Sequence, residues 1–537
     1  MAKPPAALPG PVSRSTKMSK AAAKSDVPKS TEPESVGRSQ WPGSVGSVVT
    51  SSRLTATRLA DDTGNPTPSE TPVESKSAFG HGRFQKTMLL CAQLATMLAY
   101  SYSFTLFIDF EPAEHWCAPP EQFANVSEEQ WKNAAIPPSV LAIPCVGIAS
   151  DIFGRRLVLL TALAVVIVSG VATCLASSLV AYGILRCISS AACSAIEVTS
   201  FILLFESTQP GPRGPYCALA ICWPTLLAPI YVAGLAILIK GWVIFNLMIL
   251  LPSAFLLVTA CLVEESPHWL LVSLRFEDAE RVALYAARFN DEDTDRVRRR
   301  IDAIRHAAML KNPPGRAASF LEATKRSLAA TFMCGGLARR SFVLSIAWFT
   351  LYLIYYGGVA TDDKSVSHHY ELAKWLVVVG NAPAMAVAYF LVKYHDHLAT
   401  IVMVMSTVSI ALAVQSALVA FDLSLPLAVL IMWMKLLLNI TYVVLCVHTV
   451  AMFPTEVRSV GFSGTYMWGR LGATSASALK EIEDQLIGSV KALPLAMSAL
   501  ALALASLFLV TLGDEALPEA SMMAMMWHGE PRRQLKR

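Results

Sequence analysis

Apolar stretches long enough to cross a lipid bilayer recur along most of this chain. The hydrocarbon core of a bilayer is about 30 Å thick, and an α-helix of roughly 20 residues spans it. Only 16% of the 537 residues are charged and 54% are hydrophobic, whereas about 25% of the residues in soluble domains are charged. The sequence therefore predicts an all-α polytopic membrane protein. Hydropathy places twelve spanning helices at residues 86–108, 134–150, 157–177, 179–205, 216–239, 243–263, 341–360, 371–392, 398–421, 425–452, 460–479 and 490–512.

The predicted spans divide the chain into five segments. Residues 1–84 are rich in Pro, Ser, Ala and Lys, bury too little apolar surface to offset chain entropy, and are expected to be disordered. Six spans fill residues 85–263, a polar linker with amphipathic helices occupies residues 264–340, six further spans fill residues 341–512, and residues 513–537 form a tail. The equal number of spans on both sides of the linker suggests an internal duplication.

Lys and Arg residues near the span ends set the expected orientation, because cytoplasmic loops carry an excess of them. The connections after the second, fourth, sixth and tenth spans are basic, whereas the alternate connections are acidic or nearly neutral. We therefore expect both termini and the linker in the cytoplasm, and the protein in the plasma membrane. The sequon Asn-Val-Ser then lies outside, where Asn125 is a candidate acceptor for N-glycosylation.

A short charged turn, SDIFGRRLVLL at residues 150–160, separates the second and third spans. Gly154 allows the chain to turn sharply. Arg155 and Arg156 are suited to meet lipid headgroups as a plain positive-inside anchor. That interpretation leaves the position of Asp151 unexplained.

The pattern D-x-x-G-R-R in this turn resembles the hallmark loop of the major facilitator superfamily. The resemblance implies that Asp151 pairs with the arginines and that the turn belongs to a conformational latch. Such a latch holds the cytoplasmic side shut through charges at neighbouring helix ends and then releases it. The latch residues implied here are Asp151, Gly154, Arg155, Arg156, Glu206, Arg213, Glu264 and Arg458.

Further motifs resemble the organic cation and anion transporters among the solute carriers. The resemblance implies a major-facilitator-type twelve-helix bundle of two six-helix halves, which binds a small organic ion near the membrane midplane and moves it by alternating access. One of the motifs, EESPHWLL, also fits a plain amphipathic helix with Ser266 as N-cap and Pro267 in the first position. The motifs are HGRFQ at 81–85, PAEHWCAPP at 112–120, EESPHWLL at 264–271, YYGG at 355–358, FPTEVRSVG at 453–461 and LPEA at 517–520.

The chain also departs from the pattern of this family. Where the acid-glycine-arginine turn should repeat, the second half reads KYHDHL at 393–398. Ala451 stands where family members usually carry an acid, His268 replaces an arginine, and the first outer loop holds only Cys117, so its usual disulfides cannot form within it. These changes weaken a second latch. A non-transporting sensor or scaffold on a carrier fold is therefore an alternative to a carrier, and a channel is another.

Charged side chains inside a membrane are costly and mark functional sites. Glu197, Lys435 and Arg470 fall within predicted spans. The resemblance implies that Arg470 pairs with a substrate carboxylate or sulfonate, because organic anion carriers have an arginine there. An internal ion pair with Glu197 is the alternative for Arg470. Lys435 is a further candidate contact, for which a structural role is favoured.

Four aromatic residues lie near one face of the seventh span, because three to four residues separate successive members. They are Trp348, Tyr352, Tyr355 and Tyr356. Such rings are suited to hold flat organic ions or cations, or to form an aromatic belt near the outer leaflet. The family resemblance favours a substrate pocket.

Motifs for other functions are missing from the sequence. It contains no Walker loop, HExxH or GxSxG motif, and no paired CxxC spacing suggests zinc. We therefore expect no enzyme, no cofactor and no metal site. The expected partners are a small organic ion, with an anion favoured and a cation left open, and the lipid bilayer. No nucleic acid is expected, and the oligomeric state and coupling mechanism stay open.

Overall fold

The computed structural model describes residues 82–109, 139–176, 178–239, 241–311, 328–329, 331–332, 335–358, 370–421, 423–486 and 493–512. Within these residues the regular secondary structure is helical, and none of them forms a strand. This confirms the predicted all-α fold. Asn125, Cys117, the leader up to residue 81 and the tail 513–537 lie outside the described residues.

The first six predicted spans all coincide with helices. The sixth was predicted as one helix, and this is corrected by the structure, which turns at Leu250 between two shorter helices. Pro252 in the first turn of the second helix has no N–H to donate, and its ring clashes with a preceding carbonyl in a continuous helix. The helices are α1 (Arg83–Asp109), α3 (Ser139–Phe153), α4 (Arg155–Cys174), α5 (Leu179–Ser207), α6 (Pro210–Leu238), α7 (Trp242–Ile249) and α8 (Leu251–Leu262).

The last six predicted spans also coincide with helices. The seventh begins before its predicted start, at Gly335, and its C-terminal end widens into the π-helical turn η2 (Ile354–Gly358) at the YYGG motif. The helices are α13 (Gly335–Leu353), α15 (Tyr370–Tyr394), α16 (His397–Ala420), α17 (Ser424–Met452), α18 (Arg458–Leu486) and α19 (Leu493–Leu512), with the short 3-10 turn η4 (Thr455–Val457) before α18.

Within residues 264–311, which the structure describes, three helices follow the first six spans. They are α9 (Pro267–Val272), α10 (Phe276–Phe289) and α11 (Thr294–Lys311). The hydroxyl of Ser266 accepts a hydrogen bond from the Trp269 amide at 3.2 Å, and Pro267 opens α9, as the sequence predicted. These helices share a small apolar core of their own, which includes Leu270, Val282 and Ile301.

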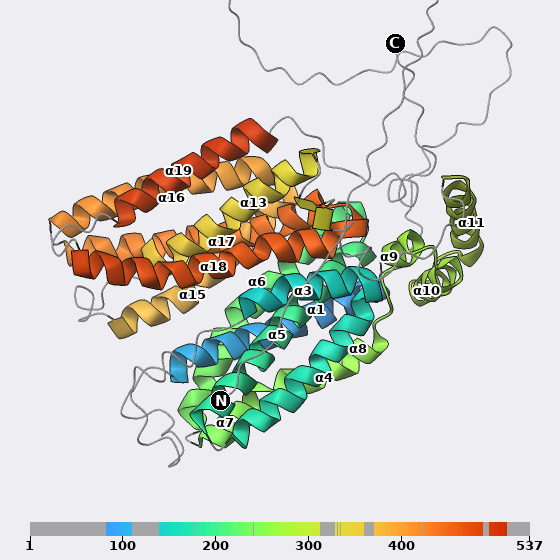
Figure 1. Ribbon diagram of the computed structural model, residues 1–537, viewed down its shortest axis with the longest axis horizontal. Coiled ribbons are helices and arrows are strands. Elements are labelled where there is room, and N and C mark those ends of the chain that lie inside the picture. Colours follow the sequence, from blue (N-terminus) through green and yellow to red (C-terminus); the bar gives the residue numbers. More distant parts are fainter. Residues whose placement is uncertain are drawn as a thin grey trace, which may run out of the picture. The chain divides into compact units, whose positions relative to one another are not determined.

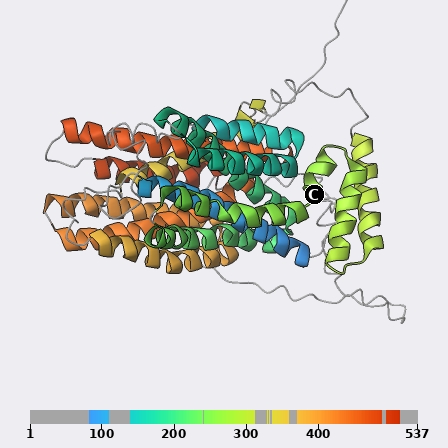
Figure 2. The same ribbon diagram turned by 90° about the horizontal axis from the view of Figure 1, so that it is seen from below.

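The helices form a bundle of two halves, α1–α8 and α13–α19, drawn in blue to green and in yellow to red in Figure 1. Contacts of α3 with α18 and of α6 with α15 join the halves. Gly147 permits the first of these contacts, because a Cβ at this position would lie 1.9 Å from the Ser463 hydroxyl and 2.6 Å from the Ser459 carbonyl oxygen. We call the end of the bundle that carries α9–α11 the linker end (Figure 2).

Seven segments among the described residues are long and apolar enough to cross a membrane. Large apolar side chains on their outer faces are exposed, for example Val168 and Leu238 at 70% and 81%. Such surfaces suit lipid rather than water, so the chain is a multi-pass membrane protein. The seven segments are Arg155–Cys174, Val180–Ser207, Pro210–Leu238, Val243–Leu262, Leu337–Gly357, His397–Leu418 and Leu425–Met452.

Candidate functional site

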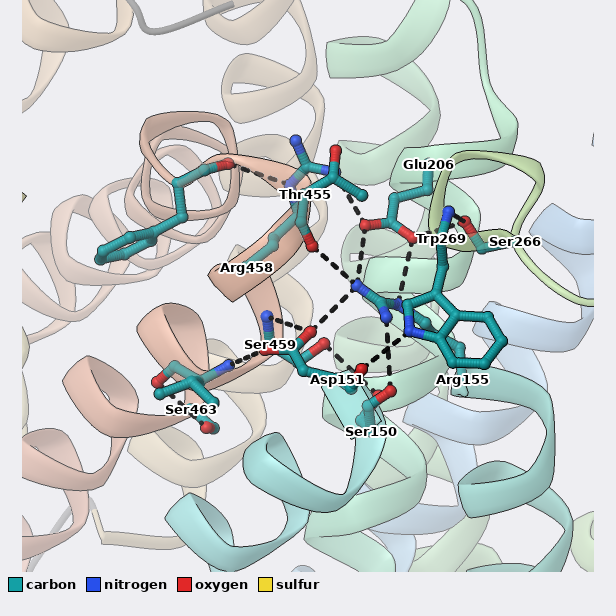
Figure 3. Close-up of polar contacts among 12 residues, drawn as sticks. Ser150, Asp151, Arg155, Glu206, Ser266, Trp269, Thr455, Arg458, Ser459 and Ser463 are labelled. Carbon is teal, nitrogen blue, oxygen red and sulfur yellow. Dashed lines mark hydrogen bonds and ion pairs between the residues drawn. The ribbon is translucent and has the colours of Figure 1, made fainter. Parts of the chain in front are cut away.

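The guanidinium of Arg155 is fully buried at the linker end, where polar groups surround it (Figure 3). It forms ion pairs with Asp151 at 3.0 Å and with Glu206 at 3.2 Å. It also donates hydrogen bonds to the carbonyl oxygens of Ser150, at 3.3 Å, and Thr455, at 3.0 Å. The interpretation of Arg155 as a headgroup anchor is therefore wrong, because its charge is satisfied inside the protein.

The Glu206 carboxylate lies at the centre of this network. Besides Arg155 it binds the guanidinium of Arg458 at 2.8 Å, and it accepts a hydrogen bond from the Ser266 hydroxyl. The side chains of Glu206 and Arg458 are 0% and 3% exposed. Buried charges are tolerated when they are paired and hydrogen-bonded, so α5, α4 and α18 are held together by shared charges.

Asp151 connects the two halves through a helix end. Its carboxylate accepts hydrogen bonds from the amides of Ser459 and Val460 at 3.3 and 2.9 Å. These amides belong to the first turn of α18, where unpaired N–H groups and the helix dipole favour a negative charge. The Asp151 carboxylate thus binds two groups at once: the guanidinium of Arg155 in its own half and the first turn of α18 in the other half.

Gly154 and Glu265 shape the turn between α3 and α4. Gly154 has φ +104°, a conformation that favours glycine. The Glu265 carboxylate accepts hydrogen bonds from the amides of Arg155 at 2.9 Å, Arg156 at 3.1 Å and Ser266 at 2.9 Å. Burial raises the pKa of the Glu265 carboxyl, and the amide donors offset this only in part.

Arg156 differs from its neighbour because it lies near the surface. It forms a 3.1 Å ion pair with Glu264, and both side chains are about one-third exposed. The indole of Trp269 donates a hydrogen bond to the Asp151 carbonyl oxygen at 2.8 Å. The motif EESPHWLL thus supplies an exposed carboxylate, a buried one and an indole to the same turn.

Arg213 and Arg458 occupy equivalent positions in the two halves. The Nε of Arg213 donates to the Thr208 carbonyl oxygen at 3.1 Å, and that of Arg458 donates to the Phe453 carbonyl oxygen at 3.2 Å, in both cases five residues back. Both guanidinium groups lie over the Phe205 ring, at 4.6 and 5.0 Å from its centroid. This shared geometry supports the internal duplication that the span count suggested.

His268 lies buried in α9 beside these charges. Burial, and next the charge of Arg213, lowers the pKa of His268 to about 3, while Glu206 acts in the opposite direction. The imidazole is therefore neutral at physiological pH. An arginine at this position would instead add a third positive charge beside Arg213 and Arg458.

A second group of polar residues lies far from the linker end, between α5 and α18. The guanidinium of Arg470 approaches the Glu197 carboxylate at 3.8 Å and donates to the Tyr466 hydroxyl at 3.1 Å. The Tyr442 hydroxyl donates to Glu197 at 3.3 Å and accepts from the Tyr100 hydroxyl at 2.9 Å. Both halves therefore contribute to one charged site inside the membrane.

Aromatic rings from the second half pack around this ion pair. Trp348 is fully buried, its indole donates to the Thr449 hydroxyl at 3.2 Å, and its ring centroid lies 4.9 Å from that of Tyr466. The guanidinium of Arg470 lies over the rings of Tyr466 and Tyr352, at 5.4 and 6.0 Å. Trp348 and Tyr352 thus face the interior and do not form an outer belt. We call Glu197, Trp348, Tyr352, Tyr442, Tyr466 and Arg470 the central cluster.

The remaining predicted contacts lie at the edge of the central cluster or beyond it. Tyr356 lies 6.0 Å from Tyr352 and 5.1 Å from Tyr355, between ring centroids, and is partly exposed. Lys435 is half-buried on α17, two helical turns before Tyr442 and on the same face.

A narrow cavity adjoins the central cluster between the two halves. Among its lining residues are Thr96, Glu197, Phe201, Ile221, Tyr442 and Tyr466. The two charged or hydroxyl-bearing partners of Arg470 therefore reach this space. A guanidinium presents a planar fork of donors that matches a carboxylate or a sulfonate, and the rings beside it offer flat apolar contact. Within the described residues, no group of three or more His, Cys, Asp or Glu side chains could hold a metal ion.

Among the described residues of the second half, the turn at 393–398 has no equivalent of the Asp151–Arg155 ion pair. Asp396 accepts a hydrogen bond from the Ala399 amide at 3.1 Å and so caps its own helix, α16. His397 lies 3.4 Å from the Val392 carbonyl oxygen, and its ring is 6.3 Å from that of His448. At KYHDHL, where a weakened second latch was predicted, Asp396 and His397 thus contact backbone groups close to them in the sequence.

Sequence reasoning missed several members of both sites. Tyr100, Tyr442 and Tyr466 carry no charge and have no unusual neighbours in the sequence, so only tertiary packing identifies them. The backbone partners could have been suspected, because Thr455, Ser459 and Val460 lie within the FPTEVRSVG motif and the last two belong to the first turn of α18.

Comparisons with known proteins agree with this architecture. The family model described as Sugar (and other) transporter matches residues 140–514. Organic anion transporter 3 of Rattus norvegicus is 23% identical over 390 residues, which cover 72% of this chain and 70% of that protein. Solute carrier family 22 member 6-B of Xenopus laevis is 23% identical over 327 residues, and this match spans 61% of the chain but only 58% of the relative.

Solved structures resemble the fold at lower identity. The proton:xylose symporter XylE bound to 6-bromo-6-deoxy-D-glucose superposes with a TM-score of 0.61 at 15% identity, over 83% of this chain and 96% of that chain. An inward-open form of the xylose transporter XylE from E. coli gives a TM-score of 0.52 at 14% identity, over 82% and 99%. These similarities establish the major facilitator fold.

Proposed function

Because the chain belongs to the family of sugar and other transporters, we propose that it carries small organic anions across the membrane by alternating access. The observation that carries the proposal is Arg470 of α18, an arginine within the predicted eleventh span, whose side chain is 23% exposed where the two halves meet. Placing an arginine inside a membrane costs free energy, so such a residue generally pairs with another group or binds a substrate. A relative named organic anion transporter 3 supports an anion.

In this proposal Arg470 binds the anionic group and the rings of Trp348 and Tyr352 hold the organic part of the substrate. Tyr355, Tyr356 and Lys435 contact the substrate at the margin of the site. Arginine suits the role because its guanidinium stays charged and forms two parallel hydrogen bonds with a carboxylate or sulfonate.

Alternating access requires that contacts between the halves break at one end at a time. We assign this role at the linker end to the latch residues, with Arg155, Glu206, Arg458 and Asp151 as its buried centre. In this proposal the linker end faces the cytoplasm of a cell whose plasma membrane the protein spans, with both termini inside, and the basic connections of the sequence support this orientation. Asn125 then faces outside as the glycosylation acceptor.

Uptake into oocytes tests the function. Wild type would be compared with Arg470→Ala, using radiolabelled para-toluenesulfonate and tetraethylammonium as anionic and cationic probes. We expect saturable sulfonate uptake that falls at least about tenfold in Arg470→Ala, since one charge-assisted hydrogen bond contributes about 1.5–3 kcal/mol. Surface biotinylation controls for expression. Arg298→Ala on α11 is the matched control, because its guanidinium pairs with Glu280 at the surface.

Undiminished sulfonate uptake in Arg470→Ala would contradict the proposal. A sensor or scaffold is the second candidate, favoured by Asp396, which caps its own helix and forms no second latch. Sulfonate binding to wild type without any flux would support that alternative.

A further inference from the structure

Glu197 and Arg470 place opposite charges from the two halves at one site. Glu197 projects from α5 and Arg470 from α18, 3.8 Å apart, and their side chains are 11% and 23% exposed. The small cavity that adjoins this pair is lined by Glu197 itself. Without substrate, the Glu197 carboxylate is therefore the counter-charge of the Arg470 guanidinium.

An organic anion that binds Arg470 must come close to Glu197. Two negative charges within about 4–6 Å disfavour each other's ionised forms, and in a membrane interior solvent does little to screen them. One arginine cannot neutralise both anions. Binding of the substrate thus requires that Glu197 either moves away or loses its charge.

The groups around Glu197 include a single cation, and one of them holds the carboxylate in place. The groups that face it are Arg470, Tyr466 and Tyr352 from the second half's α18 and α13, Tyr442 and Cys446 from α17, Tyr100 from α1 and Cys193 from its own helix. Arg470 is the single cation in this set of described residues. The Tyr442 hydroxyl, itself held by Tyr100, keeps the carboxylate in place by a 3.3 Å hydrogen bond.

We propose that Glu197 couples transport to protons: it takes up one proton when an organic anion binds Arg470, so that anion and proton cross the membrane together. This inference rests on the proposed function. A proton from water on the side of entry forms an O–H bond with the Glu197 carboxylate, and the Arg470–Glu197 ion pair is replaced by an Arg470–substrate pair. On the other side the anion leaves, the O–H bond breaks, the proton passes to water and the ion pair re-forms.

The charge balance of this cycle makes it measurable. One anion and one proton carry no net charge, so transport by wild type does not respond to the membrane potential. Without the carboxylate, as in Glu197→Gln, the anion crosses alone and its movement becomes sensitive to the potential. Tyr442 is a positioning residue, and Tyr442→Phe should weaken the coupling without removing sulfonate binding.

Proteoliposomes that contain the full chain provide the test. The probe is radiolabelled para-toluenesulfonate, which stays ionised across the pH range used, so protonation of the probe cannot imitate coupling. A pH gradient is imposed, and potassium with valinomycin sets the membrane potential separately. For wild type we expect accumulation of up to about tenfold per pH unit of inward proton gradient, with no response to the potential.

Glu197→Gln should bind the sulfonate but show no accumulation driven by the pH gradient, and its uptake should follow the potential. Glu280→Gln, which removes a partly exposed carboxylate from α10, is the matched control and should behave as wild type. Gradient-driven accumulation that persists in Glu197→Gln would overturn the inference, as would wild-type uptake that ignores pH and follows the potential. No sulfonate uptake by wild type at any pH would instead contradict the proposed function, and the inference with it.

Discussion

Glu206 of α5 and Arg458 of α18 form a 2.8 Å ion pair that joins the two halves at the linker end and is almost completely buried. The pair shares its carboxylate with Arg155 of α4, which Asp151 also binds, so two carboxylates balance two guanidinium groups. The strength of this junction depends on every member being present, because removing one charge leaves the others buried and uncompensated.

Glu206→Gln should therefore destabilise the protein strongly. The variant leaves Arg155 and Arg458 without their shared counter-charge, and such a loss costs about 3–5 kcal/mol. Thermal unfolding of the detergent-purified protein measures the effect as a lower Tm. Glu264→Gln is the matched control, because its partner Arg156 lies at the surface, where an ion pair contributes about 0–1 kcal/mol. Similar Tm values for the two variants would contradict a central role for Glu206.

Gly147→Ala should prevent closure of the linker end. The added Cβ would collide with the Ser459 carbonyl oxygen and the Ser463 hydroxyl, so α3 cannot approach α18 as it does in this structure. The amides of Ser459 and Val460 then lose their bonds to Asp151, and hydrogen–deuterium exchange in this segment should accelerate.

Gly211→Ala is the control for this exchange experiment. It adds the same methyl group at a helical glycine where a Cβ meets nothing within 4 Å. Equal exchange rates at Ser459 and Val460 in the two variants would show that close packing at Gly147 does not hold the linker end shut.

Gly154→Ala should destabilise the turn between α3 and α4. A non-glycine residue at φ +104° is strained by about 1–3 kcal/mol, and the new Cβ would lie 2.4 Å from the Glu265 carboxylate. The expected result is a lower Tm together with reduced sulfonate uptake. Glu265→Ala leaves three amides without an acceptor and should act in the same direction. A Tm unchanged by Gly154→Ala would refute the assigned geometry.

His268 should make stability depend on pH. Its pKa is lowered to about 3, so below pH of about 6.5 the unfolded chain binds a proton that the folded protein excludes. The contribution of neutral His268 to the free energy of unfolding is fully present above this pH. It is lost as the pH falls toward 3, by up to about 1.4 kcal/mol per pH unit.

His268→Gln removes that titration, so its Tm should fall less than that of wild type between pH 7 and pH 5. His306→Gln, at an exposed position on α11, should keep the wild-type slope. Parallel Tm curves for wild type and His268→Gln would contradict the prediction.

The order of the helices could be predicted from hydropathy alone, because each span must supply an apolar surface of fixed length to the bilayer. The break at Leu250 was missed, since apolar residues on both sides gave the hydropathy no signal. Pro252 was the one sequence signal that indicated a break in the helix. The start of α13 at Gly335 was missed because a basic pair, Arg339 and Arg340, looked like the end of the linker.

Charge made the sites partly predictable. The resemblance of the D-x-x-G-R-R turn to the hallmark loop suggested the Asp151–Arg155 ion pair, and the intramembrane positions of Glu197 and Arg470 suggested theirs. The surface position of Arg156 and the burial of Arg155 could not be distinguished by sequence, because adjacent residues in a helix point about 100° apart and only the packing decides which faces inward. Tyr442 and Tyr466 were beyond prediction for the same reason.

The central claim is that Arg470 holds the anionic group of the substrate. Equilibrium binding of radiolabelled para-toluenesulfonate to the purified protein tests it most directly, because binding is separated from flux and from coupling. The account predicts saturable binding by wild type and a loss of affinity of about 10- to 100-fold in Arg470→Ala, with Arg298→Ala unchanged. Equal affinity in wild type and Arg470→Ala would contradict it.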